Sequence, residues 1–326
     1  MALKASAILI ALALTAWAVS FTGAAHSSVY AQASRINQTF GGGRESQNPS
    51  SARTLPAPAR FREQTGRGLL LRVWVNDTGP FNFALDTGAG SNIIAPRVAA
   101  AARVTYTGAR AVPITGLSGA GGGAGREATI KSLAVGERGN DLPGRAPVLV
   151  TDALPPDLDG VLDPAESYYP LGFILDLPAG TISAFDPRAL PLRGRAQPAD
   201  GAIVPWLNEA GTRRPFVQLG NGRRALLDTG SGFGLAVSAA AARAFGIGAE
   251  AGRERAGVRD LGRGQVAARR VASATVQIGG LVLRGVPTDV LYGAALDAPV
   301  ILGRDALRPF RLTFDPASRL IAVEPR

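Results

Sequence analysis

The chain has 326 residues, 46% of them hydrophobic, a formal net charge of +10 and no cysteine. This length and composition fit one large or two ordinary globular domains, and the lack of cysteine excludes thiolate nucleophiles, disulfides and cysteine zinc sites. The single histidine, His26, lies in an N-terminal stretch with export features. Without that stretch, a Ser-His-Asp relay and a histidine-bound metal are also excluded, so acid–base chemistry falls to carboxylates and we expect no cofactor or metal.

The positive charge comes almost wholly from arginine, since lysine occurs only at Lys4 and Lys131. A nucleic-acid surface is typically a basic stripe interleaved with aromatic residues. The arginines here are scattered singly or in pairs such as Arg213-Arg214 and Arg269-Arg270. We therefore expect no nucleic-acid partner.

The N-terminus combines Lys4, an apolar run over about residues 5–25 and an A-x-A site at Ala31-Gln32-Ala33. These are the parts of a secretory signal peptide, predicted over residues 1–33, which would place the mature protein in the periplasm or outside the cell. The alternative is an uncleaved helix that anchors the protein to a membrane, because the run approaches the length of a bilayer span. Residues 34–65, rich in Gly, Ser, Pro and Arg, are predicted to be a flexible leader.

The first predicted lobe covers residues 66–188 and begins with strands over 69–75 and 81–85, joined by an Asn/Gly turn. Asp86-Thr87-Gly88 follows directly, and then a strand over 92–95 and a short alanine-rich helix opening at Pro96. An aspartate directly behind an apolar strand is costly unless it has partners, because apolar neighbours cannot solvate a carboxylate.

Farther along the first lobe, residues 114–128 form a candidate hairpin flap with seven small residues, 119–125, at its tip. Such glycine density is typical either of a mobile lid or of a merely flexible connector. Val161-Leu162 is followed by Asp163 and Pro164, and a hairpin over 173–185 closes the lobe.

A linker over residues 189–201 leads to a second predicted lobe, 202–326, which repeats the plan. Strands over 215–219 and 223–227 flank a Gly-Asn-Gly turn, Asp228-Thr229-Gly230-Ser231 follows, and then come a strand over 235–237 and a helix opening at Ser238. Val300-Ile301-Leu302-Gly303 and a hairpin over 310–323 complete the repeat.

One Asp-Thr-Gly alone would be an ordinary turn, since all three residue types favour turns. Two copies in matching strand and helix contexts indicate a paired site. Gly88 and Gly230 let the backbone turn sharply and bring N–H groups near the carboxylates, where a side chain would crowd them.

These paired motifs, with an apolar-apolar-Gly at Ile301-Leu302-Gly303, resemble the aspartic peptidases of the pepsin and retropepsin superfamily. The pattern of motifs most resembles that of bacterial retropepsin-like proteins in a tandem, single-chain form. The resemblance covers nearly all of the chain after residue 66. It implies an all-β, bilobal pepsin-like fold with few short helices, in which two pseudo-twofold-related β-barrel lobes flank the active site.

The resemblance also implies an endopeptidase in which Asp86 and Asp228 share one proton and activate a water between them. Which aspartate is acid and which is base stays open, because the titration belongs to the pair. Thr87 and Thr229 match threonines that hydrogen-bond to the opposite loop, and the Ser231 hydroxyl is expected to donate to Asp228. The expected partner is a peptide or protein in extended conformation. With two sites in one chain, we expect a monomer.

The sequence departs from the family pattern in two places. Asp163 stands where the pattern has glycine, and the flap candidate lacks the tyrosine of pepsin-like flaps. An alternative interpretation therefore stays open: an inactive envelope protein of the same fold that binds peptides or other ligands.

Overall fold

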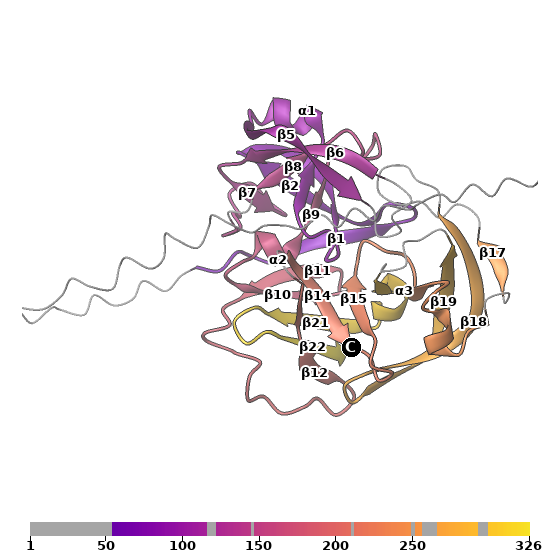
Figure 1. Ribbon diagram of the computed structural model, residues 1–326. Helices are drawn as coiled ribbons and strands as arrows, with labels where there is room; N and C mark the ends of the chain where they lie inside the picture. The colour runs from indigo at the N-terminus through magenta and orange to yellow at the C-terminus, as the bar shows by residue number, and fades with distance from the viewer. Residues whose placement is uncertain are drawn as a thin grey trace, which may run out of the picture. The chain divides into compact units, whose positions relative to one another are not determined.

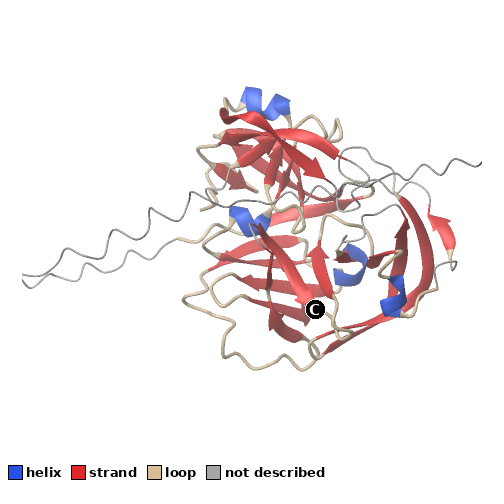
Figure 2. Ribbon diagram, in the orientation of Figure 1, coloured by secondary structure: helices blue, strands red, loops and turns tan. Residues whose placement is uncertain are grey.

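The computed structural model describes residues 54–326 except 116–121, 145–146, 210–211, 249–251, 256–265 and 293–298. The predicted signal peptide and most of the predicted leader lie outside these residues. The described chain is mostly β-strand with a few short helices, as Figures 1 and 2 show. None of the described helices has the length and apolar character needed to cross a membrane.

The N-terminal half contains eleven strands and two short helices in the described residues. They are β1 (Ala59–Gln64), β2 (Gly68–Val75), β3 (Thr78–Leu85), β4 (Asn92–Ile94), α1 (Pro96–Ala101), β5 (Thr105–Thr115), β6 (Gly122–Thr129), β7 (Leu133–Val135), β8 (Val148–Val150), β9 (Gly160–Leu162), α2 (Pro164–Ser167), β10 (Gly172–Asp176) and β11 (Thr181–Phe185).

The C-terminal half also has eleven described strands. Its elements are β12 (Ala202–Pro205), β13 (Leu207–Glu209), β14 (Thr212–Gln218), β15 (Arg224–Asp228), β16 (Leu235–Ser238), the 3-10 helix η1 (Ala242–Phe245), β17 (Arg253–Arg255), β18 (Ala267–Ile278), β19 (Leu281–Tyr292), β20 (Val300–Gly303), α3 (Arg304–Leu307), β21 (Phe310–Asp315) and β22 (Leu320–Pro325).

The predicted repeat is present in the strand pairing. In the N-terminal half β3 runs parallel to β9, β9 pairs antiparallel with β4, and β4 runs parallel to β8. In the C-terminal half β15, β20, β16 and β19 reproduce this order and these directions. Strands β3 and β15, which end at the two Asp-Thr-Gly sequences, therefore occupy equivalent places in the two halves.

The hairpins that lead into these sequences turn where the sequence predicts. Asn76 and Asp77 both have positive φ, 48° and 64°, and they join Val75 of β2 to its partner Thr78 of β3. Gly222, with φ 79°, serves the hairpin of β14 and β15. Left-handed backbone of this kind matches the right-handed twist of the flanking strands.

The predicted leader over residues 34–65 ends too late. Strand β1 begins at Ala59 and pairs with β2 and β11. Ala59 is buried and Phe61 packs against the core, so this segment gains enough apolar contact to be ordered. Its polar residues, such as Arg60 and Arg62, are exposed to solvent. Because they make the segment polar in composition, composition alone predicts a flexible leader here and not a strand.

A second correction concerns the helix predicted to open at Ser238. Ser238 is the last residue of β16, and the helical segment that follows is the 3-10 turn η1, starting at Ala242. The Ser238 hydroxyl oxygen still accepts the backbone N–H of Ala241, as a capping side chain does.

The two halves share one sheet. In the order β12-β22-β21-β10-β11-β1, three strands of the C-terminal half are followed by three of the N-terminal half, and the two groups meet where β10 pairs with β21 (Figure 1). The closing hairpins predicted over 173–185 and 310–323 are β10–β11 and β21–β22. Residues 186–201, all of them described, form neither helix nor strand and lead from β11 to β12, where the linker is predicted.

The flap candidate forms a hairpin of β5 and β6, in which Ile114 pairs with Gly123. β5 is the edge strand of its sheet. The turn residues 116–121 lie outside the described residues, so the predicted lid behaviour of the tip stays a prediction.

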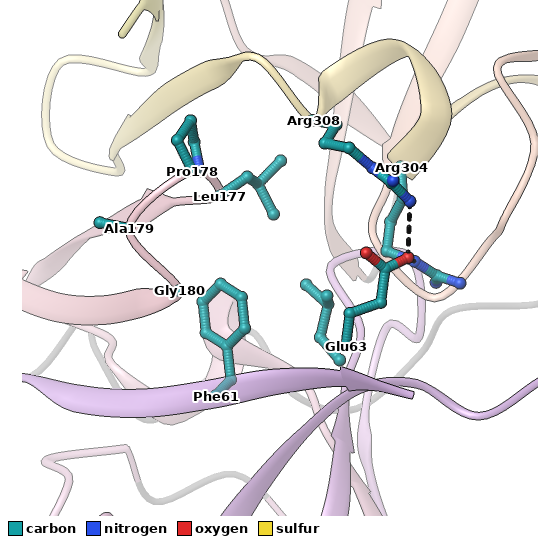
Figure 3. A pocket seen from close by; sticks show the side chains of 9 residues that line it. Phe61, Glu63, Leu177, Pro178, Ala179, Gly180, Arg304 and Arg308 are labelled. Atoms are coloured by element: carbon teal, nitrogen blue, oxygen red, sulfur yellow. Dashed lines mark hydrogen bonds and ion pairs between the residues drawn. The ribbon is translucent and has the colours of Figure 1, made fainter. Parts of the chain in front are cut away.

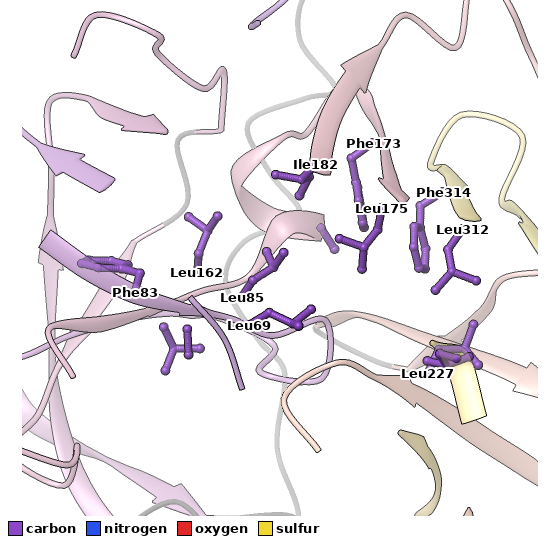
Figure 4. Close-up of a cluster of buried hydrophobic side chains, with 14 of the residues drawn as sticks. Leu69, Phe83, Leu85, Leu162, Phe173, Leu175, Ile182, Leu227, Leu312 and Phe314 are labelled. Carbon is purple, nitrogen blue, oxygen red and sulfur yellow. The ribbon is translucent and has the colours of Figure 1, made fainter. Parts of the chain in front are cut away.

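The larger of the two hydrophobic clusters among the described residues runs through both halves (Figure 4). Phe173 of β10 and Phe314 of β21 are register partners whose rings stack with centroids 4.3 Å apart. Trp206 meets the Phe314 ring edge-on at 5.8 Å. This aromatic group joins strands from the two halves inside the shared sheet, so it couples their stability.

We predict that Phe314→Ala lowers the free energy of unfolding by about 3–5 kcal/mol, because it leaves a cavity between the two halves. Leu190→Ala is the control, because the Leu190 side chain is 70% exposed and its loss should change stability by less than about 0.5 kcal/mol. Urea denaturation followed by circular dichroism measures both. Equal effects of the two substitutions would contradict the shared-core interpretation.

Candidate active site

The ends of β3 and β15 bring Asp86 and Asp228 together, close enough for their two carboxyl groups to interact directly. Each carboxylate also accepts a backbone N–H from its own loop. Asp86 Oδ1 accepts from Gly88 at 2.7 Å, and Asp228 Oδ1 accepts from Gly230 at 2.8 Å. Asp228 is buried, whereas Asp86 keeps some solvent exposure. The pair can therefore hold a proton between two fixed oxygen-bearing groups.

The two glycines are required by the opposite carboxyl group. A Cβ atom on Gly230 would lie 2.3 Å from Asp86 Cγ, and one on Gly88 would lie 2.8 Å from Asp228 Cγ. Neither distance is compatible with a side chain. The crowding expected from the sequence is thus present, and it arises across the pair rather than within each loop.

Thr87 and Thr229 tie the two loops together by a reciprocal exchange of hydrogen bonds. The Thr87 hydroxyl donates to Leu227 O at 2.6 Å and accepts the Thr229 N–H at 3.1 Å. The Thr229 hydroxyl donates to Leu85 O at 3.1 Å and accepts the Thr87 N–H at 3.1 Å. Both threonines are fully buried, so these four bonds are shielded from competing water.

Ser231 contacts Asp228 in a different way from the one predicted. Its backbone N–H donates to Asp228 Oδ1 at 3.1 Å, while its hydroxyl oxygen accepts the N–H of Phe233 at 3.3 Å. The short Gly-rich loop turns tightly enough to aim the amide at the carboxylate, and the side chain is used to brace the loop.

The environment raises the pKa of both aspartates. For Asp86 burial is the main cause, opposed by the hydrogen bond from Asp228, by backbone N–H groups and by the positive charge of Arg304. For Asp228 burial again leads and the charge of Asp86 adds to it, so its pKa is raised well above the usual value. Two close carboxyl groups that resist double ionisation share a proton.

Arg304, which the sequence analysis did not identify, holds the Asp228 loop through hydrogen bonds to its backbone. It opens α3, is 8% exposed, and its Nη1 donates to Thr229 O at 2.6 Å and Gly230 O at 2.9 Å. Glu63 of β1 lies beside it and accepts from Arg308 Nη2 at 2.9 Å (Figure 3). In the sequence, the feature that could have indicated this role is that Arg304 follows directly after the apolar segment Val300–Gly303.

Asp163 lies in the position that Gly303 has in the other half. Leu162 pairs with Leu85 as Leu302 pairs with Leu227. A Cβ on Gly303 would lie 2.4 Å from Phe233 O. The two positions also differ in their backbone partners. The Asp163 N–H donates to the side-chain oxygen Asn92 Oδ1, whereas the Gly303 N–H donates to the backbone oxygen of Gly234.

The departure at Asp163 therefore leaves the strand pairing beneath the Asp86 loop intact.

The described residues contain no group of three or more acidic or histidine side chains that could hold a metal ion. The arrangement offers two adjacent carboxyl groups, held by backbone amides and by a buried threonine exchange. Chemically, such a pair can accept a proton at one group while donating one from the other.

Two protein-family models match the chain, one on each half. A model described as "Aspartyl protease" matches residues 71–163, and one described as "gag-polyprotein putative aspartyl protease" matches residues 220–309. Each match contains one Asp-Thr-Gly sequence and the strands that carry it. None of the curated proteins matches the sequence significantly.

We predict that Thr87→Val destabilises the protein by about 2–4 kcal/mol, because it leaves the buried Thr229 N–H and Leu227 carbonyl without partners. Thr87→Ser keeps the hydroxyl and should cost less than half as much. Denaturant unfolding of both variants, and of Thr229→Val with the double variant, measures the coupling between the loops. A larger destabilisation by serine than by valine would show that packing of the methyl group, and not the hydroxyl exchange, matters here.

Proposed function

Because the chain belongs to the retropepsin-like aspartic peptidase superfamily, we propose that it is an aspartic endopeptidase whose catalytic residues are Asp86 and Asp228. The observation that carries the proposal is the close approach of these two carboxyl groups at the ends of equivalent strands, where each packs against the glycine of the opposite loop. The groups come from the two matched halves, so one chain carries both members of the pair.

In the proposed reaction a water held by the pair attacks the peptide carbonyl carbon. One carboxylate takes a proton from the water, and the other carboxyl group gives its proton to the carbonyl oxygen. The carboxyl group that took the proton from the water then gives it to the amide nitrogen, and the C–N bond breaks. The other carboxylate takes back a proton from a hydroxyl of the intermediate as the carboxylic acid product forms, which restores the starting pair. The positive charge of Arg304 stabilises the negative charge that the pair carries once one proton is lost.

The substrate proposed is a peptide or protein segment in extended conformation. The β5–β6 hairpin supports this, because it occupies the chain position of a flap and β5, paired with β6 on one side, lies at an edge of its sheet. An edge strand can hydrogen-bond to an extended peptide through its backbone, which gives affinity with little sequence preference. We further propose export to the periplasm or the exterior, on the basis of residues 1–33, and sequencing of the mature N-terminus tests it.

We predict that Asp86→Asn and Asp228→Asn each lower peptide turnover by at least about 10²–10⁴-fold, because each removes one member of the acid–base pair. Both variants should remain folded, since asparagine has the same shape as aspartate. A fluorogenic library of unstructured peptides, assayed from pH 3 to pH 9, measures turnover.

Asp77→Asn is the matched control, because Asp77 is a turn residue whose side chain is 64% exposed. The activity of this variant should equal that of the wild type. Cleavage that persists in both active-site variants would overturn the proposal. Peptide binding without any cleavage by the wild type would instead favour the ligand-binding alternative.

A further inference from the structure

Asp163 is a third carboxyl group beneath the Asp86 loop that the proposed reaction does not use. It is completely buried and caps α2, where its Oδ1 accepts the N–H groups of Ala165 at 2.8 Å and Glu166 at 3.4 Å. Its Oδ2 is also buried and has no hydrogen-bond partner among the described residues. A buried carboxylate oxygen without a partner is strongly unfavourable, whereas a protonated carboxyl group tolerates such a position far better.

The charges that face Asp163 are unfavourable to its ionised form. Glu166 of α2 and Asp86 of the adjacent loop are both acidic. The cation that reaches this region, Arg213 of β14, forms its ion pair with Glu166. Within the described part of the chain, Asp163 has no ion pair of its own, so ionisation would add an uncompensated negative charge beside Asp86.

The backbone couples this group directly to the pair. The Asp86 N–H donates to Leu162 O at 3.0 Å, and Asp163 is the next residue. Asn92 Oδ1 accepts both the Asp163 N–H and the Ser167 hydroxyl at 2.9 Å, so strand β4, the Asp86 loop and α2 meet at this point. Hydrating an ionised Asp163 would require these elements to separate.

We propose that Asp163 is a positioning residue that keeps the Asp86 loop in its working geometry only while its carboxyl group is uncharged, and that its ionisation sets an upper pH limit for the loop. The expected effect of Asp163 on peptide cleavage rests on the proposed function. Its structural part stands on burial, the unpartnered oxygen and the acidic surroundings. Glycine at the equivalent position 303 supplies no such titratable group.

The direction of the pH effect follows from the pKa. Burial, then the charges of Glu166 and Asp86, raise the pKa of Asp163 from 3.8 to about 8. A group whose pKa is higher in the folded than in the unfolded state stabilises the fold fully below its unfolded pKa. That contribution is lost as the pH rises through the folded value, so the window runs from about pH 4 to about pH 8.

The first test compares the melting temperatures of the wild type and Asp163→Asn from pH 4 to pH 9. Asparagine keeps the size and the cap but cannot ionise, so the wild type should lose on the order of 10 °C more than the variant between pH 4 and pH 8. Asp163→Ser, which also caps a helix without a charge, should show the same flatter profile. Parallel profiles for all three proteins would overturn the proposal.

The second test compares peptide cleavage against pH, each profile normalised to its own maximum. The alkaline limb of Asp163→Asn should lie at higher pH than that of the wild type, because only the wild type loses active molecules through Asp163 ionisation. The acid limbs should coincide. An alkaline limb of the wild type that equals or exceeds that of the variant would overturn the proposal, since an ionised Asp163 would then be harmless.

The two tests separate this inference from the proposed function. If the wild type cleaves no peptide in any condition, the peptidase proposal fails, and the melting profiles still decide whether Asp163 is held uncharged. If the wild type cleaves and the melting profiles are parallel, the peptidase proposal survives and the role of Asp163 fails.

Discussion

The reciprocal hydrogen bonding of Thr87 and Thr229 is the constraint on which the candidate site depends. Each hydroxyl binds the backbone of the opposite half as both donor and acceptor. A buried exchange of this kind leaves little freedom for the loops to shift, because any displacement would leave polar groups unpaired in a dry environment. The two carboxyl groups come within hydrogen-bond reach because their neighbours in sequence are held in this way.

The same two-fold plan carries an unequal distribution of charge. Below the Asp228 loop a cation, Arg304, holds two backbone carbonyl oxygens and stabilises negative charge on Asp86. Below the Asp86 loop the matching region offers an acid, Asp163, which disfavours that charge when it ionises. The two equivalent halves thus place groups of opposite charge type beside their loops, a cation near the Asp228 loop and an acid near the Asp86 loop.

The halves are joined by far more than the two loops. Strands β10 and β11 of the first half and β21, β22 and β12 of the second form a continuous run in one sheet. The Phe173–Phe314 stack lies within it. A shared sheet and a shared aromatic core resist separation of the halves, so the distance between the aspartates is set by the packing of the whole described chain.

The sequence alone determined the fold class, the internal repeat, the two hairpins and the identity of the paired residues. These features depend on local chemistry: alternating β-branched residues, left-handed turns at Asn76 and Gly222, and an aspartate directly behind each apolar strand. Local chemistry also explains why the glycine roles could be stated in advance, whereas the threonine roles were expected from the resemblance to the aspartic peptidases.

Only the tertiary structure decided the rest, because it depends on contacts between residues far apart in the chain. The sequence did not reveal that β1 belongs to the ordered fold, since its order comes from pairing with β2 and β11. It did not reveal Arg304, whose role lies in reaching the carbonyl groups of a loop more than seventy residues earlier. Asp163 could be recognised as a departure, but its burial, its unpartnered oxygen and its acidic surroundings arise from packing, which no local pattern encodes.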